Sequence, residues 1–337
     1  MDSVNLKSIA AHFNVSIATV SKALNGLPGV SGELRERIVE YADKNQYIPN
    51  MFGRGLKGIR YGTIGVIMPD NANPVYSRQI KGIEEEARES GYSIILCNSC
   101  DDWQLEKQYI NILLQKNVDG ILMIPAAEMN NTNDRYEILR QNNVPFLLMN
   151  RFISGYVGDI VKPDFKRAAN MATTYLIEKG HTKILYITPK RGYSSSKERI
   201  EGVIMAHSQM SIPFQKDNIC YCDTSSYEAG YRAMLQILDD KQKEFSAIFA
   251  FNDYVALGLM KAILERGLRI PEDIALIGYD DIEFCDICAI PLTTVRQESF
   301  LVGRMSFNFL FQRINGSIDG TINHVILPTG IIERNSV

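Results

Sequence analysis

The feature that most constrains this fold is the alternation of short apolar runs with amphipathic helical stretches throughout residues 61–337. Strand-length runs that alternate with helices fold as parallel α/β sheets, because each helix returns the chain to the same edge of the sheet. Helices are predicted over residues 76–90 and 253–266. The predicted strands are residues 63–68, 93–97, 120–124, 145–149, 183–188, 247–251 and 274–278.

The number of predicted strands is high for a single sheet. The recurrence also breaks near residues 155–165. We therefore expect two similar, doubly wound parallel lobes within residues 61–337. In open α/β sheets, ligands collect beyond the carboxyl ends of the strands. Polar residues stand at those ends: Asp70, Asn71, Asn73, Asn150, Asn252 and Asp280.

The first 48 residues have a different pattern, which predicts three short helices around one small core. Asn5 can cap the first helix and Ser31 the third, which is expected over residues 32–45. The apolar stripe of the first helix is Leu6, Ile9, Ala10 and Phe13, and that of the third is Leu34, Ile38, Tyr41 and Ala42.

The second helix, residues 17–24, follows a tight turn at residues 14–15 and a possible cap at Ser16. Val20 and Leu24 face inward, which leaves an outer face of Ile17, Ala18, Ser21 and Lys22. Small, polar and singly basic, this face fits a recognition helix in the DNA major groove. Lys22 can donate a hydrogen bond to guanine, and Ile17 and Ala18 can contact thymine methyl groups. An exposed helix with an incidental lysine is the alternative.

The distribution of charge along the chain supports DNA binding by the first 60 residues. The chain carries a net charge of -3, but residues 1–60 hold eight Lys and Arg against five Asp and Glu. The head is therefore +3 and the remainder -6. A basic head on an acidic body fits a polyanion that binds at one end only.

The motif Val-Ser-Ile-Ala-Thr-Val-Ser-Lys-Ala-Leu-Asn at residues 15–25 resembles the signature of the LacI/GalR family of bacterial transcription regulators. The resemblance continues through residues 47–50, 73–74, 199–202, 252–258, 278–281 and 291–295, and so covers nearly the whole chain. It implies a helix-turn-helix head, a hinge helix and a two-lobed sensing domain similar to periplasmic sugar-binding proteins.

By matched position, the resemblance implies that Ile17, Ala18 and Lys22 face base edges. It places Ser16, Thr19, Ser21 and Asn25 at phosphates. Asn50, Arg54 and Leu56 match hinge residues that bind DNA, with Leu56 as the wedge in the minor groove. Gly53 and Gly55 each cost about 0.8 to 1 kcal/mol in a helix, so we expect this hinge to be disordered without DNA.

The resemblance also implies an effector site in the cleft between the lobes. Arg199, Asn252 and Asp280 are its strongest candidates. Asn150, Asp70, Asn73 and Tyr76 follow, and Tyr227 is a further candidate. Amides and carboxylates beside an arginine suit sugar hydroxyls. For Asn73 and Asp253, the alternative is that they only cap helices. For Asp280 with Asp281, the alternative is a metal or acid–base pair, but a turn with one ligand contact is preferred.

The expected organisation has a DNA-binding domain at residues 1–48, a hinge at 49–60 and an effector-binding domain at 61–337. Three crossings between the lobes are expected near residues 160, 292 and 322. The first lobe would comprise residues 61–160 and 292–321, and the second residues 161–291 and 322–337. Gly53, Gly55 and Gly58 also match a dinucleotide fingerprint, but they lack the required preceding strand.

Catalytic motifs are missing from the sequence: it has no nucleophile elbow, Walker loop or His-Glu-x-x-His, so we expect neither an enzyme nor a cofactor. The pairs Cys97 with Cys100 and Cys285 with Cys288 have Cys-x-x-Cys spacing, which a metal site could use, but inert thiols are favoured. The sequence has neither a signal peptide nor a membrane span, so a cytoplasmic location is expected.

These expectations combine into one mechanism. We expect a repressor that binds a palindromic operator in double-stranded DNA as a symmetric homodimer, since one helix-turn-helix covers only a half-site. No heptad tail is present to join dimers. A small ligand in the cleft, expected to be a carbohydrate, would change DNA affinity. The rivals are a sugar-transport receptor and an enzyme that uses the cleft.

Overall fold

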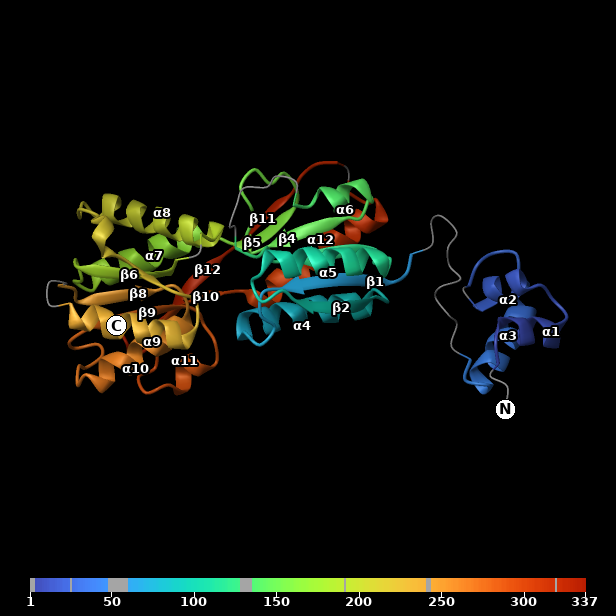
Figure 1. The fold of residues 1–337 in the computed structure, drawn as a ribbon, viewed down its shortest axis with the longest axis horizontal. Coiled ribbons are helices and arrows are strands. Elements are labelled where there is room, and N and C mark those ends of the chain that lie inside the picture. The colour runs from blue at the N-terminus through green and yellow to red at the C-terminus, as the bar shows by residue number, and fades with distance from the viewer. Residues whose placement is uncertain are drawn as a thin grey trace. The chain divides into compact units, whose positions relative to one another are not determined.

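The structure is a computed structural model that describes residues 4–24, 26–47, 60–127, 135–190, 192–240, 244–318 and 320–337. Its contacts divide the chain into two compact units, Met1–Tyr61 and Gly62–Val337. Each unit has its own hydrophobic core. Figure 1 labels the helices and strands of both units. The predicted hinge contacts Asn50, Arg54 and Leu56, and also Asn25, lie outside the described residues.

The smaller unit contains the three predicted helices, α1 (Leu6–Phe13), α2 (Ile17–Leu24) and α3 (Gly32–Lys44). Asn5 caps α1: its side-chain oxygen accepts hydrogen bonds from the backbone of Lys7 and Ser8, each at 3.0 Å. Asn14 ends the helix in the left-handed conformation, with φ of 50°. The core consists of Ile9, Ala10, Val20, Ala23, Ile38 and Ala42.

Two capping predictions have different outcomes. The Ser16 hydroxyl accepts a hydrogen bond from the backbone of Thr19 at 3.1 Å, as expected of a cap. Ser31 precedes α3 at the capping position, but within the described head its side chain makes no capping hydrogen bond. The serine at residue 31 therefore does not stabilise α3 in the way that its sequence position predicts.

The first lobe of the larger unit is a six-stranded parallel sheet in the order β11-β5-β4-β3-β1-β2. Its strands are β1 (Thr63–Met68), β2 (Ser93–Asn98), β3 (Gly120–Met123), β4 (Phe146–Met149), β5 (Ile160–Pro163) and β11 (His324–Leu327). The helices of this lobe are α4 (Pro74–Glu89), α5 (Trp103–Gln115), α6 (Glu137–Gln141) and α12 (Ser299–Asn315).

The second lobe repeats this plan in the order β12-β10-β9-β8-β6-β7. Its strands are β6 (Ile184–Pro189), β7 (Ile219–Cys222), β8 (Ala247–Ala250), β9 (Ala275–Asp280), β10 (Thr293–Gln297) and β12 (Thr329–Ile332). Its helices are α7 (Phe165–Glu178), α8 (Ser194–Gln209), η2 (Lys216–Asn218), α9 (Tyr227–Asp239), α10 (Asp253–Glu265) and α11 (Phe284–Ile287). The predicted parallel arrangement holds for the other strand pairs, and at one edge β12 pairs with β10 antiparallel.

The crossings between the lobes fall later than predicted. Strand β5 pairs with β4 in the first sheet, so the first crossing follows residue 163 rather than residue 160. Strand β10 pairs with β9 in the second sheet, and β11 returns to the first, so the other crossings follow residues 297 and 327. The strands β5, β10 and β11 are too short for their partner sheet to be evident from hydrophobic pattern.

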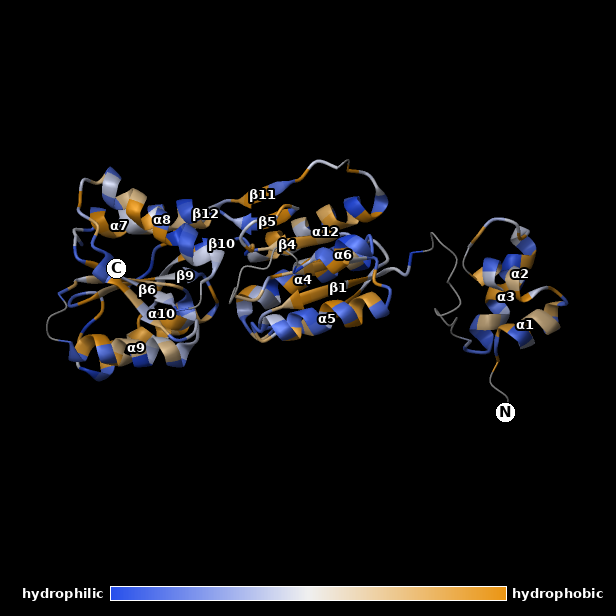
Figure 2. Cartoon of the chain, turned by 45° about the horizontal axis from the view of Figure 1, so that its top comes forward, coloured by the Kyte–Doolittle hydropathy of each residue, from blue (hydrophilic) through white to orange (hydrophobic). Residues whose placement is uncertain are grey.

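The burial of the central strands explains why the hydrophobic pattern predicted them correctly. All residues of β3, β4 and β8 are buried or nearly so, as expected of strands covered by helices on both faces. Figure 2 shows hydrophobic residues along β1, whereas α5 and α9 carry both hydrophobic and hydrophilic residues. None of the helices that the structure describes is long and apolar enough to cross a membrane.

Candidate DNA-binding face and ligand cleft

The second helix of the head presents the outer face that its sequence predicts. Ile17 is 43% exposed, and Ala18 and Lys22 are also exposed. Val20 and Ala23 on the opposite side are buried. The Ser16 and Thr19 hydroxyls lie 2.9 Å apart at the start of α2, and Ser21 is half-buried. The face therefore has apolar and cationic groups at its surface.

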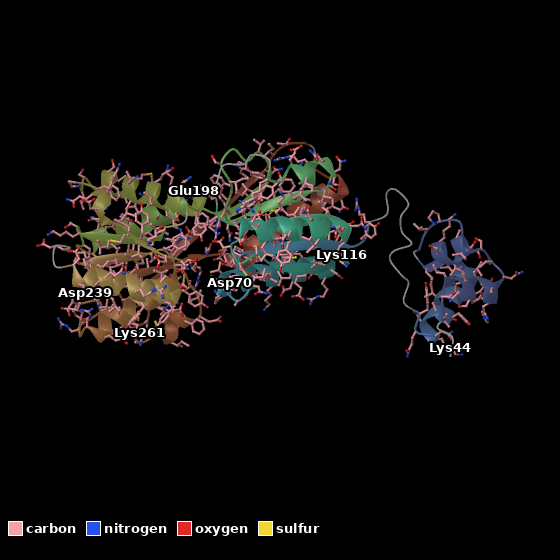
Figure 3. All side chains as sticks on the ribbon, in the orientation of Figure 1. Lys44, Asp70, Lys116, Glu198, Asp239 and Lys261 are labelled. Carbon is pink, nitrogen blue, oxygen red and sulfur yellow. The ribbon has the colours of Figure 1, made fainter. Side chains whose placement is uncertain are left out.

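In the larger unit, the strand ends bring most of the predicted effector residues together. Six of the seven line one small cavity of about 40 Å³, which we call the inner chamber: Asn73, Tyr76, Asn150, Arg199, Asn252 and Asp280. Asp70 instead lines a neighbouring cavity of about 590 Å³, the outer chamber, together with Tyr227. Figure 3 shows Asp70 at the boundary between the two lobes, far from Lys116 and Asp239 at their outer ends.

Arg199 is the central cation of the inner chamber. It projects from α8 and is only 9% exposed. Its guanidinium carbon lies 3.7 Å from the ring centre of Tyr279, 4.5 Å from that of Phe251 and 4.9 Å from that of Phe165. One guanidinium nitrogen donates to the carbonyl of Phe251. The buried Nε has no hydrogen-bond partner among the described residues.

The three asparagines of the inner chamber all have structural hydrogen bonds. Asn73 caps α4 by accepting from the backbone of Val75 at 3.0 Å. Asn252 caps α10 in the same way, and its amide nitrogen donates to the carbonyl of Ser225 at 3.0 Å. The amide of Asn150 pairs with that of Gln79 through two hydrogen bonds, at 3.1 and 3.2 Å. These bonds fix the positions of the side chains in the chamber wall.

Asp253 has a structural role and is fully buried. One carboxylate oxygen accepts from the backbone of Ile282 at 3.0 Å and the other from the Thr294 hydroxyl at 2.6 Å. Asp253 therefore joins the start of α10 to the ends of β9 and β10. It lines neither chamber.

The adjacent carboxylates Asp280 and Asp281 have different surroundings. Asp281 forms ion pairs with Arg296 at 2.7 Å and Arg334 at 2.8 Å, while Asp280 accepts from the Gln297 amide at 2.5 Å. Burial raises the pKa of Asp280 well above its ordinary value, and Asp253 raises it further, while Arg199, Gln297 and Arg78 offset part of the rise. Because Asp280 and Asp281 have separate partners, their contacts argue against a paired acid–base site.

This pKa shift predicts a pH-dependent effect of Asp280→Asn. A raised native pKa means that the contribution of Asp280 to stability is present below its unfolded pKa and is lost as the pH rises through its native pKa. The asparagine stays neutral, so the stability of the variant relative to the parent should increase as the pH rises above the unfolded carboxyl pKa of about 4. Urea unfolding at a series of pH values measures this difference.

Asp273→Asn is the control, because Arg269 lowers the pKa of Asp273 to about 2. This variant should lose stability relative to the parent, by a constant amount above about pH 5. A pH-independent effect of Asp280→Asn would contradict the expected protonation of Asp280.

Sequence reasoning missed several residues of the two chambers. Arg151 follows Asn150 directly at the end of β4 and lines both chambers. The rule that ligands collect at the carboxyl ends of strands could therefore have identified Arg151 as a candidate. Gln297 was missed because its strand, β10, was not predicted. Other missed residues include Asp101, Phe165, Tyr193, Ser195, Ser225, Glu228 and Phe251.

The cysteine pairs give no sign of metal binding. All six cysteines are free thiols, and the described part of the chain holds no group of three or more His, Cys, Asp or Glu suited to a metal ion. The thiol of Cys288 lies 3.4 Å from the carbonyl of Cys285 and 3.1 Å from that of Ile290. Cys100 is exposed in the wall of the outer chamber.

The fold is that of a DNA-binding regulator with a helix-turn-helix head and a two-lobed α/β domain. Residues 5–50 match the model of the bacterial regulatory proteins of the lacI family, and residues 173–337 match a periplasmic binding protein-like domain. The HTH-type transcriptional repressor PurR of Vibrio atlanticus (strain LGP32) is 33% identical over 337 residues, which cover 98% of each chain. PurR of Vibrio vulnificus (strain CMCP6) is 33% identical over 314 residues, 92% of this chain and 91% of the relative.

Solved structures agree with these relatives. The lac repressor dimer bound to operator and the anti-inducer ONPF matches with a TM-score of 0.85 and 25% identity over 99% of both chains. A complex of the regulator CelR with cellobiose matches with a TM-score of 0.73 and 26% identity over 99% of this chain and 100% of the other. A LacI-family regulator of Enterococcus faecium with bound ribose is 31% identical, with a TM-score of 0.71, over 81% of this chain and 98% of the other.

The chain belongs to the lacI family of bacterial regulatory proteins. It is a DNA-binding transcriptional repressor and not an enzyme. The sequence prediction of the family and of the two-part fold is confirmed, and the transport-receptor and enzyme alternatives are rejected.

Proposed function

We propose that a small ligand, bound in the cleft between the two lobes, controls the affinity of this repressor for its operator. The observation that carries the proposal is the convergence of six predicted residues from both lobes on the inner chamber. Within the described residues, Arg199 Nε and Gln297 Oε1 are buried there without hydrogen-bond partners. Buried polar atoms without partners are costly, so a ligand that pairs with them gains affinity.

The chemistry of the cleft favours an uncharged sugar or sugar derivative. Donors and acceptors stand close together in the inner chamber, as alternating hydroxyl groups require. The outer chamber holds three carboxylates, Asp70, Asp101 and Glu228, against the single cation Arg151. This excess of negative charge disfavours an anionic group in the outer chamber, whereas the inner chamber has Arg151 and Arg199 beside Asp280. The ribose and cellobiose bound by two related regulators belong to the favoured class.

We also propose that the head binds DNA, with residues 1–48 as the binding domain and residues 49–60 as the hinge. Ile17, Ala18 and Lys22 would contact base edges, and Ser16, Thr19 and Ser21 would contact phosphates. Asn25, Asn50, Arg54 and Leu56 remain contacts implied by family resemblance. A symmetric homodimer would place two heads on a palindromic operator.

A thermal-shift screen tests the ligand class. Ribose, cellobiose, glucose 6-phosphate and adenine are added separately to the full-length protein. A ligand at a hundred times its Kd stabilises the native state by about 2.7 kcal/mol, which raises the melting temperature by several degrees. We expect a shift with a neutral sugar. A shift with adenine or the phosphosugar alone would overturn the carbohydrate assignment.

Substitution of Lys22 tests the reading face. Lys22→Ala should reduce the discrimination between operator and random DNA by about 1 to 3 kcal/mol, because it removes a donor to a base edge. Fluorescence anisotropy with DNA selected from a random pool measures both affinities. Lys44→Ala, which removes an exposed charge at the end of α3, is the matched control. Equal losses in both variants would remove Lys22 from the reading face.

A further inference from the structure

Arg151 lies in the wall between the inner and outer chambers. It lines both cavities, together with Asn73, Tyr76 and Ser225, and is only 8% exposed. The inner chamber holds the polar residues of the proposed ligand site, but its volume of about 40 Å³ is far below the range of about 300 to 1,000 Å³ of ligand pockets. The outer chamber, at about 590 Å³, falls within that range.

The contacts of Arg151 join the two lobes. Its guanidinium forms an ion pair with Asp101 of the first lobe at 2.8 Å and donates to the Tyr76 hydroxyl at 3.0 Å. It also lies over the ring of Tyr193 of the second lobe, with the guanidinium carbon 4.0 Å from the ring centre. The Tyr193 hydroxyl in turn donates to Asp101. Next to this cluster, the backbone of Phe152 donates to the Ser194 hydroxyl of the second lobe at 3.0 Å.

Of the wall residues, Arg151 has a side chain whose contacts can be broken without moving the backbone or a hydrophobic core. Asn73 caps α4, and the Ser225 carbonyl accepts from Asn252. Tyr76 packs against the hydrophobic cores of both lobes. The long Arg151 side chain instead follows a strand end and is held by its guanidinium alone, in contacts that a rotamer change can break without moving the backbone.

We propose that Arg151 is a gate between the two chambers, and that opening this gate breaks its contact with Tyr193 of the second lobe. A ligand that enters the outer chamber reaches Arg199, Asn252 and Asp280 only after the Arg151 side chain moves away. That movement separates Arg151 from Asp101 and from Tyr193, so occupancy of the inner chamber and these contacts of Arg151 are mutually exclusive. The inference rests on the proposed ligand site, and adds the residue that couples the site to lobe geometry.

The gate can be tested without a ligand. Ser195, 3% exposed, lines the inner chamber and can be replaced by cysteine in the full-length protein. The alkylation rate of the thiol introduced by Ser195→Cys, with iodoacetamide as the probe, is followed by peptide mass spectrometry. We expect alkylation to be at least tenfold faster when Arg151→Ala is added. Cys100 is the internal reference, because it is already exposed in the outer chamber.

Arg313→Ala is the matched control, because it removes another partly buried Arg–Asp pair, Arg313 with Asp159 at 2.6 Å, that lies within the first lobe. Equal alkylation rates in the Arg151 and Arg313 variants would overturn the gate, as would fast alkylation in the Ser195→Cys parent. If Arg151→Ala does not fold, Arg151→Gln provides the same comparison. A tenfold acceleration combined with a negative ligand screen would reject the proposed ligand and retain the gate.

Discussion

Removal of residues 1–60 is expected to abolish salt-dependent retention of the protein on DNA. These residues carry a net charge of +3, and the rest of the chain carries -6, so the larger unit alone should be repelled by phosphates. The full chain should bind nonspecific DNA at low salt and lose affinity steeply as salt rises, because each phosphate contact releases counterions. Retention on a DNA column at increasing salt measures both proteins.

The truncated protein should remain folded, because Gly62–Val337 is a separate compact unit with its own cores. Its thermal unfolding midpoint, and its response to any sugar that stabilises the full chain, are the controls. Retention of the truncated protein at the same salt concentration as the full chain would place the DNA-binding surface outside the head.

The second large effect is expected from Arg199→Ala. Arg199 is the buried cation of the inner chamber, and its Nε is free of hydrogen-bond partners within the described part of the chain. A hydrogen bond to a charged group contributes about 1.5 to 3 kcal/mol, so its loss should weaken ligand binding by roughly 10 to 150-fold. Calorimetric titration with the sugar that gives the largest thermal shift measures the change.

Arg296→Ala is the control for Arg199→Ala, since Arg296 is in the same lobe but pairs with Asp281 and lines neither chamber. Arg199→Ala should leave affinity for nonspecific DNA unchanged, because that affinity comes from the head. Ligand binding that is weakened equally by both substitutions would indicate a general effect on the second lobe. Damage to DNA binding by Arg199→Ala in the absence of ligand would contradict two separate modules.

Hydrophobic periodicity was enough to locate long elements. The strand β1 was predicted to the residue, and α4 and α10 within two residues at each end, because both faces or one full face of these elements are buried. Periodicity failed for β5, β7 and β10 to β12. It succeeded for β3, β4 and β8, which have only four residues each, so length alone does not explain the failure. In such short segments, the pairing partner decides whether a strand forms, and that partner lies far away in sequence.

For the candidate site too, the sequence identified some residues but did not reveal their contacts. The rule for strand ends and the family resemblance identified Asn73, Asn150, Arg199, Asn252 and Asp280. Neither could reveal that Asn150 pairs with Gln79, or that Arg199 lies against three aromatic rings. Those contacts join residues tens of positions apart, so only the folded chain brings them together.

By itself, the sequence determined the family, the helix-turn-helix head with its exposed Ile17 and Lys22, and the two-lobed α/β plan. Local periodicity, capping and motif spacing are written in neighbouring residues, so they can be read without coordinates. The tertiary structure alone decided which sheet receives β10 and β11, and that Asp70 lies in the outer chamber. It also decided that Arg151 stands between the chambers in contact with Tyr193, because packing between the lobes sets that contact and local sequence does not.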